Sequence, residues 1–318
     1  MRSLFVAGAA VAITIAGLPG VHAQDGTPQP RLQSGALPGG GKFTLPKVGK
    51  PPFPVPTRTS AVGSAKRLTT AVDRYPSYVP QSTCDPKERA GITAFKKLLL
   101  AKYPYTSDWG SVRNCTDDGI SEHLEGRAFD WHADSRNAKS FAAAANVLTW
   151  LTANNGYWAK RLGIMYIGYN HRIWAGYRAS EGWRKLNGNP HTDHVHFSFS
   201  WNGAYKRTSY WTGKATSEDY GPCRIYSGQP APLYTKKNTR GCAAPKALPK
   251  KWKGAKLLWR GSTGSNVKRV QAKLKIAQNG SYNAATQNAV AKWQSAHRIP
   301  RTGAVDAQTW FALGMNKK

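Results

Sequence analysis

The sequence predicts an α+β domain, built on a small antiparallel sheet with flanking helices, followed by a small all-α domain of three helices. Three observations support this prediction. Two amphipathic helical patterns lie between residues 84 and 153, two β-rich runs joined by a tight turn lie between residues 163 and 177, and residues 257–313 contain a near-repeat of a turn followed by a helix. Helices and strands arranged in this way are typical of α+β folds.

The first 23 residues differ in composition from the rest of the chain. A basic start at Arg2 is followed by an apolar run from Leu4 to Leu18 and by small residues that end at Ala23. This pattern predicts a secretory signal in residues 1–23, because the apolar run is shorter than the ~20 residues that a spanning helix needs. Residues 24–75 are rich in Pro and Gly and predict a linker, and no later segment predicts a transmembrane span.

Two helices are expected in the next part of the chain. The first is expected to have Asp85 as its N-cap and Pro86 in its first position, to present one apolar stripe, and to stop before Pro104. The second covers residues 137–153 and ends at the Asn-Asn-Gly sequence of residues 154–156. Both helices are expected to be scaffold.

The strands of the predicted sheet come from three regions. Residues 163–177 predict a hairpin, because two β-rich runs flank a short polar turn at residues 170–172. Residues 128–131 and 195–201 supply further strands. Residues 76–212 are therefore expected to form one domain, whose sheet carries chemically active side chains on neighbouring strands.

Four cysteines in an exported chain fit two disulfides, and four cysteines allow three pairings. Proximity in the sequence favours Cys84 with Cys115 and Cys223 with Cys242. The chain has no Cys-x-x-Cys spacing, so a cysteine metal cluster is not predicted.

The chain is strongly basic, with a formal net charge of +30 from 46 Lys and Arg against 16 Asp and Glu. Such a charge predicts an anionic partner, which outside a cell means wall polymers such as teichoic acids, anionic lipid or stray nucleic acid. No nucleic-acid-binding motif accompanies the charge, so wall polymers are favoured and no specific nucleic-acid partner is expected. We expect the chain to act as a monomer.

A candidate metal site is divided between two stretches of sequence. His123 and Asp130 lie on either side of a glycine in the first. The second stretch supplies further imidazoles and a carboxylate: His191, Asp193, His194 and His196. Imidazole and carboxylate ligands with one open position are usual for catalytic zinc. Because side chains alternate along a strand, His194 and His196 would face the same way, and spacing alone does not choose between them.

The pattern His-x-x-Gly-x-Ala-x-Asp, followed by Asp-x-x-His, resembles the zinc D-Ala-D-Ala carboxypeptidase family, which includes the VanX and VanY type enzymes. The resemblance implies the DD-peptidase/hedgehog-like fold and Zn²⁺ bound by His123, Asp130 and His196. It also implies Asp193 as general base and His191 as a group that polarises the scissile carbonyl. His194 is then the reserve ligand. To reach a water at the metal, Asp193 has to lie in the turn before the strand.

Charged residues near the first motif are candidates for supporting roles. Arg113 and Arg127 are possible cations for a substrate carboxylate or a developing oxyanion, and Arg113 is preferred. Glu122 and Glu125 flank His123, and they either orient its ring or remain as exposed charges.

The C-terminal third predicts a second functional unit. Residues 213–252 are expected to be a connector tied by the second cysteine pair, and residues 253–318 a separate domain. Residues 279–286 and 302–309 share the pattern Gly-x-x-Asn/Asp-x-x-Thr, a turn that leads into a helix N-terminus. This segment resembles the small three-helix peptidoglycan-binding domain often appended to wall hydrolases.

Together the two resemblances imply a secreted, cell-wall-associated zinc metallopeptidase that hydrolyses peptidoglycan stem peptides, as a D-Ala-D-Ala carboxypeptidase or an endopeptidase. Its C-terminal domain would hold it on peptidoglycan and anionic wall polymers. An alternative from another class is a catalytically silent wall-binding protein that retains the peptidase fold. A third hypothesis, nucleic-acid binding through charge alone, predicts steep salt dependence without a preference for wall polymer.

Overall fold

The computed structural model describes residues 58–61, 64–67, 70–117 and 119–316. The predicted signal in residues 1–23 and most of the predicted linker in residues 24–75 lie outside this part of the chain. The strands are β1 (Arg58–Ala61), β2 (Ser64–Arg67), β3 (Ser107–Asp108), β4 (Ala128–His132), β5 (Ile164–Tyr169), β6 (Arg172–Ala175), β7 (Arg184–Lys185) and β8 (His194–Phe199). The α-helices are α1 (Ala90–Lys102), α2 (Ala138–Leu162), α3 (Trp201–Ala204), α4 (Ser209–Thr212), α5 (Ser265–Lys273), α6 (Ala284–Ala296) and α7 (Ala307–Ala312), and the 3-10 helices are η1 (Glu122–Glu125), η2 (Gly176–Glu181) and η3 (Lys250–Trp252).

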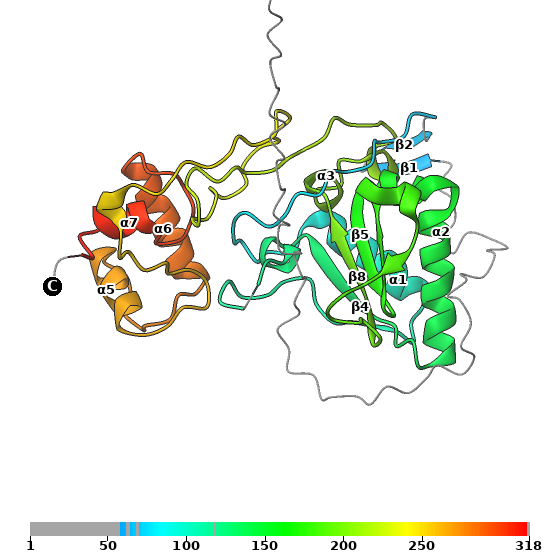
Figure 1. The fold of residues 1–318 in the computed structure, drawn as a ribbon, viewed down its shortest axis with the longest axis horizontal. Helices are drawn as coiled ribbons and strands as arrows, with labels where there is room; N and C mark the ends of the chain where they lie inside the picture. The colour runs from blue at the N-terminus through cyan, green and yellow to red at the C-terminus, as the bar shows by residue number, and fades with distance from the viewer. Residues whose placement is uncertain (1–57, 62–63, 68–69, 118, 317–318) are drawn as a thin grey trace, which may run out of the picture.

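Six strands form one open antiparallel sheet in the order β3-β4-β8-β5-β6-β7 (Figure 1). β5 and β6 are the predicted hairpin, and the turn between them contains Asn170 and His171, both with positive φ. β8 lies in the middle of the sheet although it is the last of these strands in the sequence. The predicted α+β class, with a helical C-terminal region, is confirmed.

The hydrophobic core lies on one face of this sheet. Because side chains alternate along a strand, Phe129 and Trp131 of β4 and Val195, Phe197 and Phe199 of β8 share that face, where all five are buried. α1 and α2 cover the same face with their apolar stripes. Full burial of each such side chain contributes about 1.5–3 kcal/mol. The alternate residues of β4 and β8 point to the opposite face.

The start of the first helix differs from the prediction. α1 begins at Ala90, so the expectation that Asp85 caps the helix and Pro86 opens it is wrong. The Asp85 N–H donates to the Leu124 carbonyl at 2.9 Å, and the Asp85 carboxylate pairs with Arg89 at 2.9 Å. The Asp85 carboxylate is thus paired with the Arg89 side chain, and its N–H with the distant Leu124 carbonyl, so the helix starts one turn later.

The second helix begins where expected. Asn137 is its N-cap, and the Asn137 side-chain oxygen accepts from two backbone N–H groups of the first turn, both at 3.0 Å. Helical geometry breaks at residues 153–156, as the Asn-Asn-Gly sequence predicts. The chain then continues as helix to Leu162, because Ala159 and Leu162 pack into the core.

The end of the predicted linker packs on the sheet domain. β1 and β2 pair as a two-stranded antiparallel ladder. Asp73 is buried, and its carboxylate accepts from the backbone N–H groups of Ser209 at 2.8 Å and Thr216 at 3.0 Å. Residues just before position 76 are therefore fixed by hydrogen bonds and do not act as a free connector.

The helices α5, α6 and α7 form a C-terminal domain with its own apolar core. Two buried glutamines explain its near-repeat. The Gln271 Oε1 accepts from the Gly280 N–H at 2.9 Å, and its amide donates to Thr286 Oγ1 at 3.0 Å. Gln294 makes the same two bonds one repeat later. Each glutamine thus ties the end of one helix to the following turn and the start of the next helix.

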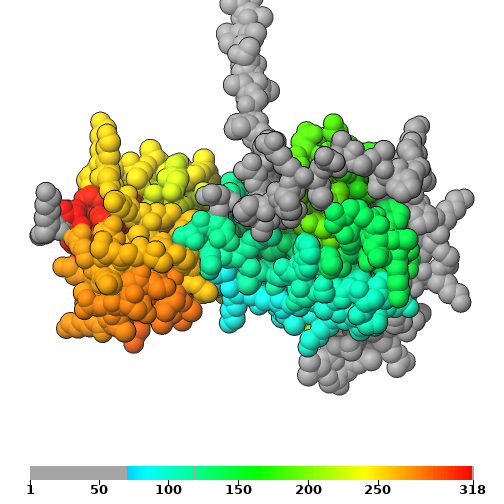
Figure 2. Space-filling view, turned by 90° about the horizontal axis from the view of Figure 1, so that it is seen from below, coloured from blue at the N-terminus to red at the C-terminus, as the bar shows by residue number. Residues whose placement is uncertain are grey.

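The C-terminal domain touches the sheet domain beside the first disulfide, and the two lobes lie against each other (Figure 2). The Cys115 N–H donates to the Arg260 carbonyl at 3.1 Å, and the Gln287 amide donates to the Cys84 carbonyl at 2.9 Å. Trp259 packs against both cysteines. The structure contains both predicted disulfides, Cys84–Cys115 and Cys223–Cys242.

Candidate metal centre

The candidate site lies on the face of the sheet opposite the core. Asp130 of β4 pairs in register with His196 of β8, which pairs in turn with Gly168 of β5. Gly168 has no side chain above the sheet, and the His191 ring lies over it, 3.5 Å from where a Cβ would be. β4 and β8 therefore place a carboxylate and an imidazole side by side in the centre of the sheet.

His123 reaches this face from η1, which Ser121 caps and Gly126 ends. The Ser121 hydroxyl accepts from the His123 N–H at 3.3 Å. Gly126 has a φ of 64°, and a Cβ at this position would lie 1.9 Å from the Lys87 carbonyl oxygen, so only glycine fits. The stretch from His123 to Asp130 thus contains the end of η1, the left-handed Gly126 and the start of β4.

His123, Asp130 and His196 form a buried cluster, and one ligand atom from each lies within 4.8 Å of the others. Asp130 Oδ1 is 3.2 Å from His123 Nε2 and 2.9 Å from His196 Nδ1. His194 Nε2 lies 3.6 Å from the same oxygen. Burial by itself would raise the pKa of Asp130, but the nearby imidazoles of His123 and His196 lower that pKa well below its ordinary value.

These residues fit a zinc ion. Both ring nitrogens of His123 are buried, and neither makes a hydrogen bond within the described part of the chain. A buried polar atom without a partner is costly, and a cation beside Nε2 would remove that cost. Two imidazoles and one ionised carboxylate are also the ligand types of catalytic zinc sites, which bind them deprotonated.

Arg113 orients the carboxylate of this cluster. Its Nη2 donates to Asp130 Oδ2 at 2.8 Å, which leaves Oδ1 facing the imidazoles. The Arg113 side chain is 21% exposed, so part of the guanidinium reaches solvent beside the site. Arg113 belongs to the loop closed by the first disulfide, and its backbone N–H donates to the His123 carbonyl at 3.4 Å. Of the two candidate arginines, Arg113 is the one at the cluster.

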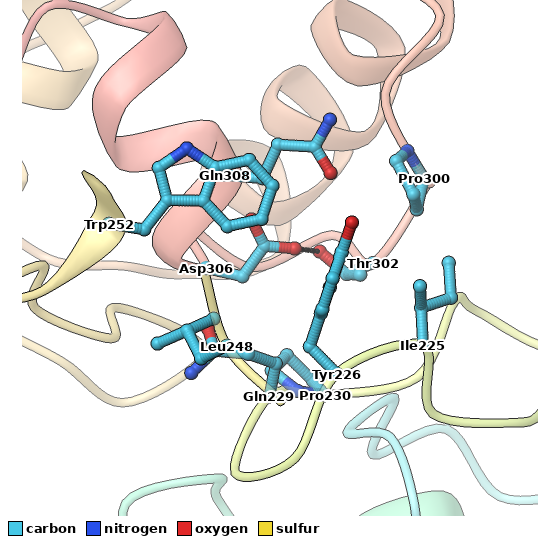
Figure 3. Close-up of a pocket in the computed structure, with 10 residues that line it drawn as sticks. All are labelled: Ile225, Tyr226, Gln229, Pro230, Leu248, Trp252, Pro300, Thr302, Asp306 and Gln308. Atoms are coloured by element: carbon cyan, nitrogen blue, oxygen red, sulfur yellow. Dashed lines mark hydrogen bonds between the residues drawn. The ribbon is translucent and has the colours of Figure 1, made fainter. Parts of the chain in front are cut away.

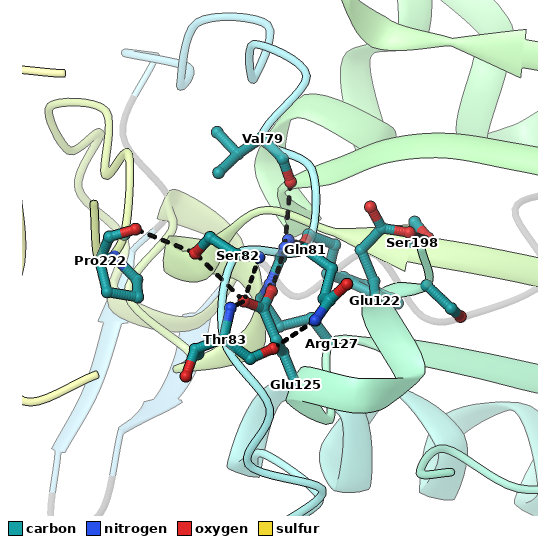
Figure 4. Close-up of polar contacts among 12 residues, drawn as sticks. Val79, Gln81, Ser82, Thr83, Glu122, Glu125, Arg127, Ser198 and Pro222 are labelled. Carbon is teal, nitrogen blue, oxygen red and sulfur yellow. Dashed lines mark hydrogen bonds and ion pairs between the residues drawn. The ribbon is translucent and has the colours of Figure 1, made fainter. Parts of the chain in front are cut away.

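Arg127 and Glu125 have structural roles (Figure 4). The Arg127 guanidinium donates to Glu125 at 2.8 Å, to the Phe199 carbonyl at 2.7 Å and to the Val79 carbonyl at 3.0 Å, and it lies 4.7 Å over the Trp201 ring. Both charged side chains are fully buried. Arg127 is therefore not available to a substrate, and the alternative that Glu125 is an exposed charge is wrong.

Glu122 is also buried, so the exposed-charge alternative is wrong for it as well. Its Oε2 accepts from the Tyr166 hydroxyl at 2.6 Å and from Ser198 Oγ at 3.1 Å. Ser198 Oγ in turn lies 3.0 Å from His196 Nε2. Glu122 thus supports His196 and not the neighbouring His123, a connection that sequence spacing did not suggest.

Asp193 lies in the bend before β8, as its predicted role requires. Its Oδ1 is 2.7 Å from His194 Nδ1, while His194 Nε2 lies on the Asp130 side of the ring. A carboxylate accepts the Nδ1 proton, so Asp193 and His194 form a pair whose imidazole lies between the carboxylate and the cluster. His194 Nε2 is farther from Asp130 than His196 Nδ1 is, which favours His196 as the ligand.

His191 lies beside the other two histidines, with its ring centroid 4.8 Å from His194 and 5.5 Å from His196. Its Nδ1 is 2.8 Å from the Asn189 carbonyl oxygen. A carbonyl only accepts, so Nδ1 carries a proton and Nε2 of the neutral ring is an acceptor. His191 can donate to a substrate oxygen through Nε2 only as an imidazolium.

Trp109 and His132 form a rim next to the cluster that no sequence pattern predicted. Their rings stack 4.3 Å apart at 6°, and Ser107 Oγ lies 3.1 Å from His132 Nδ1. Trp109 is 47% exposed, and its ring centroid is 5.7 Å from that of His194. Its position comes from a backbone bond to the carbonyl of Asp130 at 2.9 Å, which only the pairing of strands creates.

A shallow hollow lies between the connector and the C-terminal domain (Figure 3). Tyr226 and Trp252 of the connector, which meet edge to face at 5.2 Å, line it together with Thr302, Asp306 and Gln308 of the C-terminal domain. The Gln229 side chain accepts from the Ala307 N–H at 2.8 Å, which fixes the connector against the domain. The connector therefore contributes part of the surface of the C-terminal domain.

Comparisons with known families match two parts of the chain. The family model described as VldE, C-terminal domain, matches residues 84–197, a range that contains the three candidate ligands and Arg113. The family model of a peptidoglycan binding domain matches residues 263–313, the segment of α5 to α7. A comparison with curated proteins and one with solved structures each gave no match.

The chain thus contains a peptidoglycan-binding domain, as its near-repeat predicted, and this domain supports association with the cell wall. The two disulfides are consistent with an extracellular location. Within the described residues, none of the helices combines the length and the apolar character that crossing a bilayer requires.

Proposed function

We propose that the chain is a secreted zinc metallopeptidase that hydrolyses peptidoglycan stem peptides while its C-terminal domain holds it on the wall. The observation that carries the proposal is the buried cluster of His123, Asp130 and His196 around Asp130 Oδ1. The likeness of their motifs to those of zinc D-Ala-D-Ala carboxypeptidases supports the reaction. The peptidoglycan-binding domain in the same chain supports the substrate.

The three side chains of the cluster would hold the ion, and Arg113 would keep Asp130 turned so that Oδ1 faces inwards. When bound, zinc supplies a Lewis acid that polarises a carbonyl and lowers the pKa of water to about 7. The remaining tasks are proton transfer, binding of the substrate carboxylate and stabilisation of the developing negative charge.

Proton transfer belongs to the Asp193–His194 pair. Asp193 keeps the His194 proton on Nδ1, so Nε2 has its lone pair on the side of the cluster. Nε2 can then take a proton from the attacking water and return it to the leaving amine. Asp193, which the sequence predicts as the general base, would act through the ring of His194 in this arrangement.

Substrate contacts would come from the residues around the cluster. The exposed part of Arg113 suits a terminal carboxylate, because a guanidinium is always charged and matches the geometry of a carboxylate. His191, when protonated, would donate from Nε2 to the developing oxyanion. The exposed ring of Trp109 offers an apolar surface for the body of the substrate at the edge of the site.

The decisive experiment incubates the mature, zinc-loaded protein with purified sacculi and identifies the released fragments by mass spectrometry. Release of terminal D-Ala would indicate a carboxypeptidase, and separation of cross-linked stems would indicate an endopeptidase. Asp130→Asn, which alters a ligand without changing side-chain volume, is the matched control and should release nothing. Release of the same fragments by this variant would contradict the proposal.

A catalytically silent wall-binding protein is the second candidate. The charge of the C-terminal domain favours binding to anionic wall polymers both for an enzyme and for a silent protein. Asp306 is the only carboxylate side chain between Lys253 and Lys318, and it is buried, so the exposed charged groups of this segment are cationic. Such a surface attracts anionic polymers whether or not the sheet domain is active. Zinc-loaded protein that sediments with sacculi and releases no fragment would establish this alternative.

A further inference from the structure

His196 Nε2 lies at the end of a buried chain of polar groups. His196 Nε2 is 3.0 Å from Ser198 Oγ, Ser198 Oγ is 3.1 Å from Glu122 Oε2, and the Tyr166 hydroxyl donates to the same carboxylate oxygen at 2.6 Å. Glu122 and Ser198 are 1% and 0% exposed. Strand pairing produces this arrangement, since Ser198 and Tyr166 are paired residues of β8 and β5.

The direction of each hydrogen bond in this chain follows from what each group can donate. The Ser198 and Tyr166 hydroxyls both donate to Glu122 Oε2, and a serine hydroxyl has one proton to give. The Ser198 proton therefore goes to Glu122, and Ser198 Oγ can only accept from His196. His196 must then carry its proton on Nε2, which leaves the lone pair of the neutral ring on Nδ1.

The nitrogen left with the lone pair is the one that faces the cluster. His196 Nδ1 lies 2.9 Å from Asp130 Oδ1, so a neutral ring of this tautomer would bring two acceptors face to face. A cation shared by the two atoms converts that repulsion into attraction. The opposite tautomer would carry a proton on Nδ1 and could not bind a metal through that atom.

We propose that Glu122 and Ser198 are positioning residues that hold His196 in the Nε2–H tautomer and so present Nδ1 as a metal ligand. The inference deepens the proposed function and rests on its metal centre. Glu122 is kept in the interior with its second oxygen, Oε1, making no hydrogen bond among the described residues, an arrangement that costs stability. Control of the tautomer accounts for a buried carboxylate whose Oε2 accepts from two hydroxyl groups, those of Tyr166 and Ser198.

The first test measures zinc affinity by competition with a chromogenic chelator. Ser198→Ala should weaken binding by about 10–100-fold, the usual effect of removing a partner behind a metal ligand. Ser198→Thr, which keeps a hydroxyl, should restore most of the affinity. Ser209→Ala is the matched control, because Ser209 is equally buried but accepts from Arg161, away from the cluster. Unchanged affinity in Ser198→Ala would overturn the proposal.

Glu122→Gln gives an intermediate case. An amide can donate as well as accept, so the direction of the chain is no longer imposed and both tautomers of His196 become accessible. The loss of affinity should be smaller than that of Ser198→Ala and absent from Tyr166→Phe, which leaves the Ser198–Glu122 bond in place. A Tyr166→Phe effect as large as that of Ser198→Ala would indicate a general packing defect and overturn the assignment.

The second test reads the tautomer without any measurement of activity. Imidazole ¹⁵N shifts of the zinc-loaded protein, assigned to His196 by their absence from His196→Gln, should show a protonated Nε2 and a metal-bound Nδ1. A His196 ring that binds zinc through Nε2 would overturn the inference alone, whereas a protein that binds no zinc would overturn the proposed function.

Discussion

The sheet domain and the C-terminal domain treat their buried polar side chains in opposite ways. In residues 253–316 every buried side-chain nitrogen or oxygen has a hydrogen-bond partner, and Gln271 and Gln294 each use both ends of the amide. In the sheet domain, several buried side-chain atoms make no hydrogen bond within the described residues, and among them are both ring nitrogens of His123 and one oxygen of Glu122. These three atoms belong to the candidate metal centre or to the groups behind it.

The difference shows what each kind of burial is for. A satisfied buried amide stabilises one arrangement of turns and helices, and it has no capacity left for a ligand. Imidazoles and carboxylates that converge with unused capacity are unfavourable in isolation and become favourable when a cation is shared among them. We therefore expect substitutions of buried polar residues in the C-terminal domain to change its stability. Substitutions around the candidate site should instead change metal binding.

The largest expected effect is the loss of the metal. His196→Ala should lose zinc binding by more than the 10–100-fold typical of a supporting residue, because a ligand itself is removed, and the fold should persist since the core lies on the other face of the sheet. Elemental analysis after gel filtration measures the zinc content. His171→Asn, at an exposed turn histidine with positive φ, is the control and should keep its zinc. Full occupancy in His196→Ala would remove it from the ligand set.

The next effect separates proton transfer from metal binding. Asp193→Asn should retain zinc and fold but lose the ~10²- to 10⁴-fold that positioned acid–base catalysis contributes. If Asp193 acts through His194, the double variant with His194→Ala should be little slower than either single variant, because residues that act as a unit are not additive. Zinc content and turnover are measured on the same preparations. A fully active Asp193→Asn protein would contradict this mechanism, and loss of its zinc would make Asp193 a ligand.

Substitution of a buried glutamine in the C-terminal domain should lower stability without changing the zinc content. Gln294→Ala leaves the buried Gly303 N–H unpaired and removes the amide donor to the Ala304 carbonyl and Thr309 Oγ1, which should cost about 2–4 kcal/mol of the free energy of unfolding of that domain. Denaturant unfolding of the full chain, with zinc content measured in parallel, tests this expectation. The exposed Gln278→Ala should stay within about 0.5 kcal/mol of the wild type.

The smallest expected effect concerns pH. Burial raises the pKa of Asp306, although hydrogen bonds from Thr309 and Thr302 oppose this shift. The folded domain then binds the proton more tightly than the unfolded chain, so its free energy of unfolding falls as pH rises from the ordinary carboxyl range through the raised pKa. Asp306→Asn keeps the helix cap and removes the titration, so this fall should disappear. Calorimetry across that pH range measures it, with the exposed Asp117→Asn as a control that keeps the slope.

Local patterns in the sequence were sufficient for much of the fold. The hairpin of β5 and β6, the break in α2, both disulfides and the helical C-terminal domain follow from turn residues, periodicity and spacing, which depend on neighbouring residues. The predicted start of α1 was wrong because the Asp85 carboxylate pairs with the Arg89 side chain and the Asp85 N–H donates to the distant Leu124 carbonyl. Residues 279–286 and 302–309 revealed a repeat, but the glutamines that explain it lie outside the repeated motif.

The candidate site shows the same division. The sequence determined which imidazoles and carboxylates are available, and the glycine spacing indicated how His123 and Asp130 share one face. Only the tertiary structure placed Glu122 behind His196, Arg113 on Asp130 and Asp193 on His194. The physical reason is strand register: alternation along a strand decides which face a side chain occupies, whereas its partner is decided by the pairing of β4, β8 and β5, which come from distant parts of the chain.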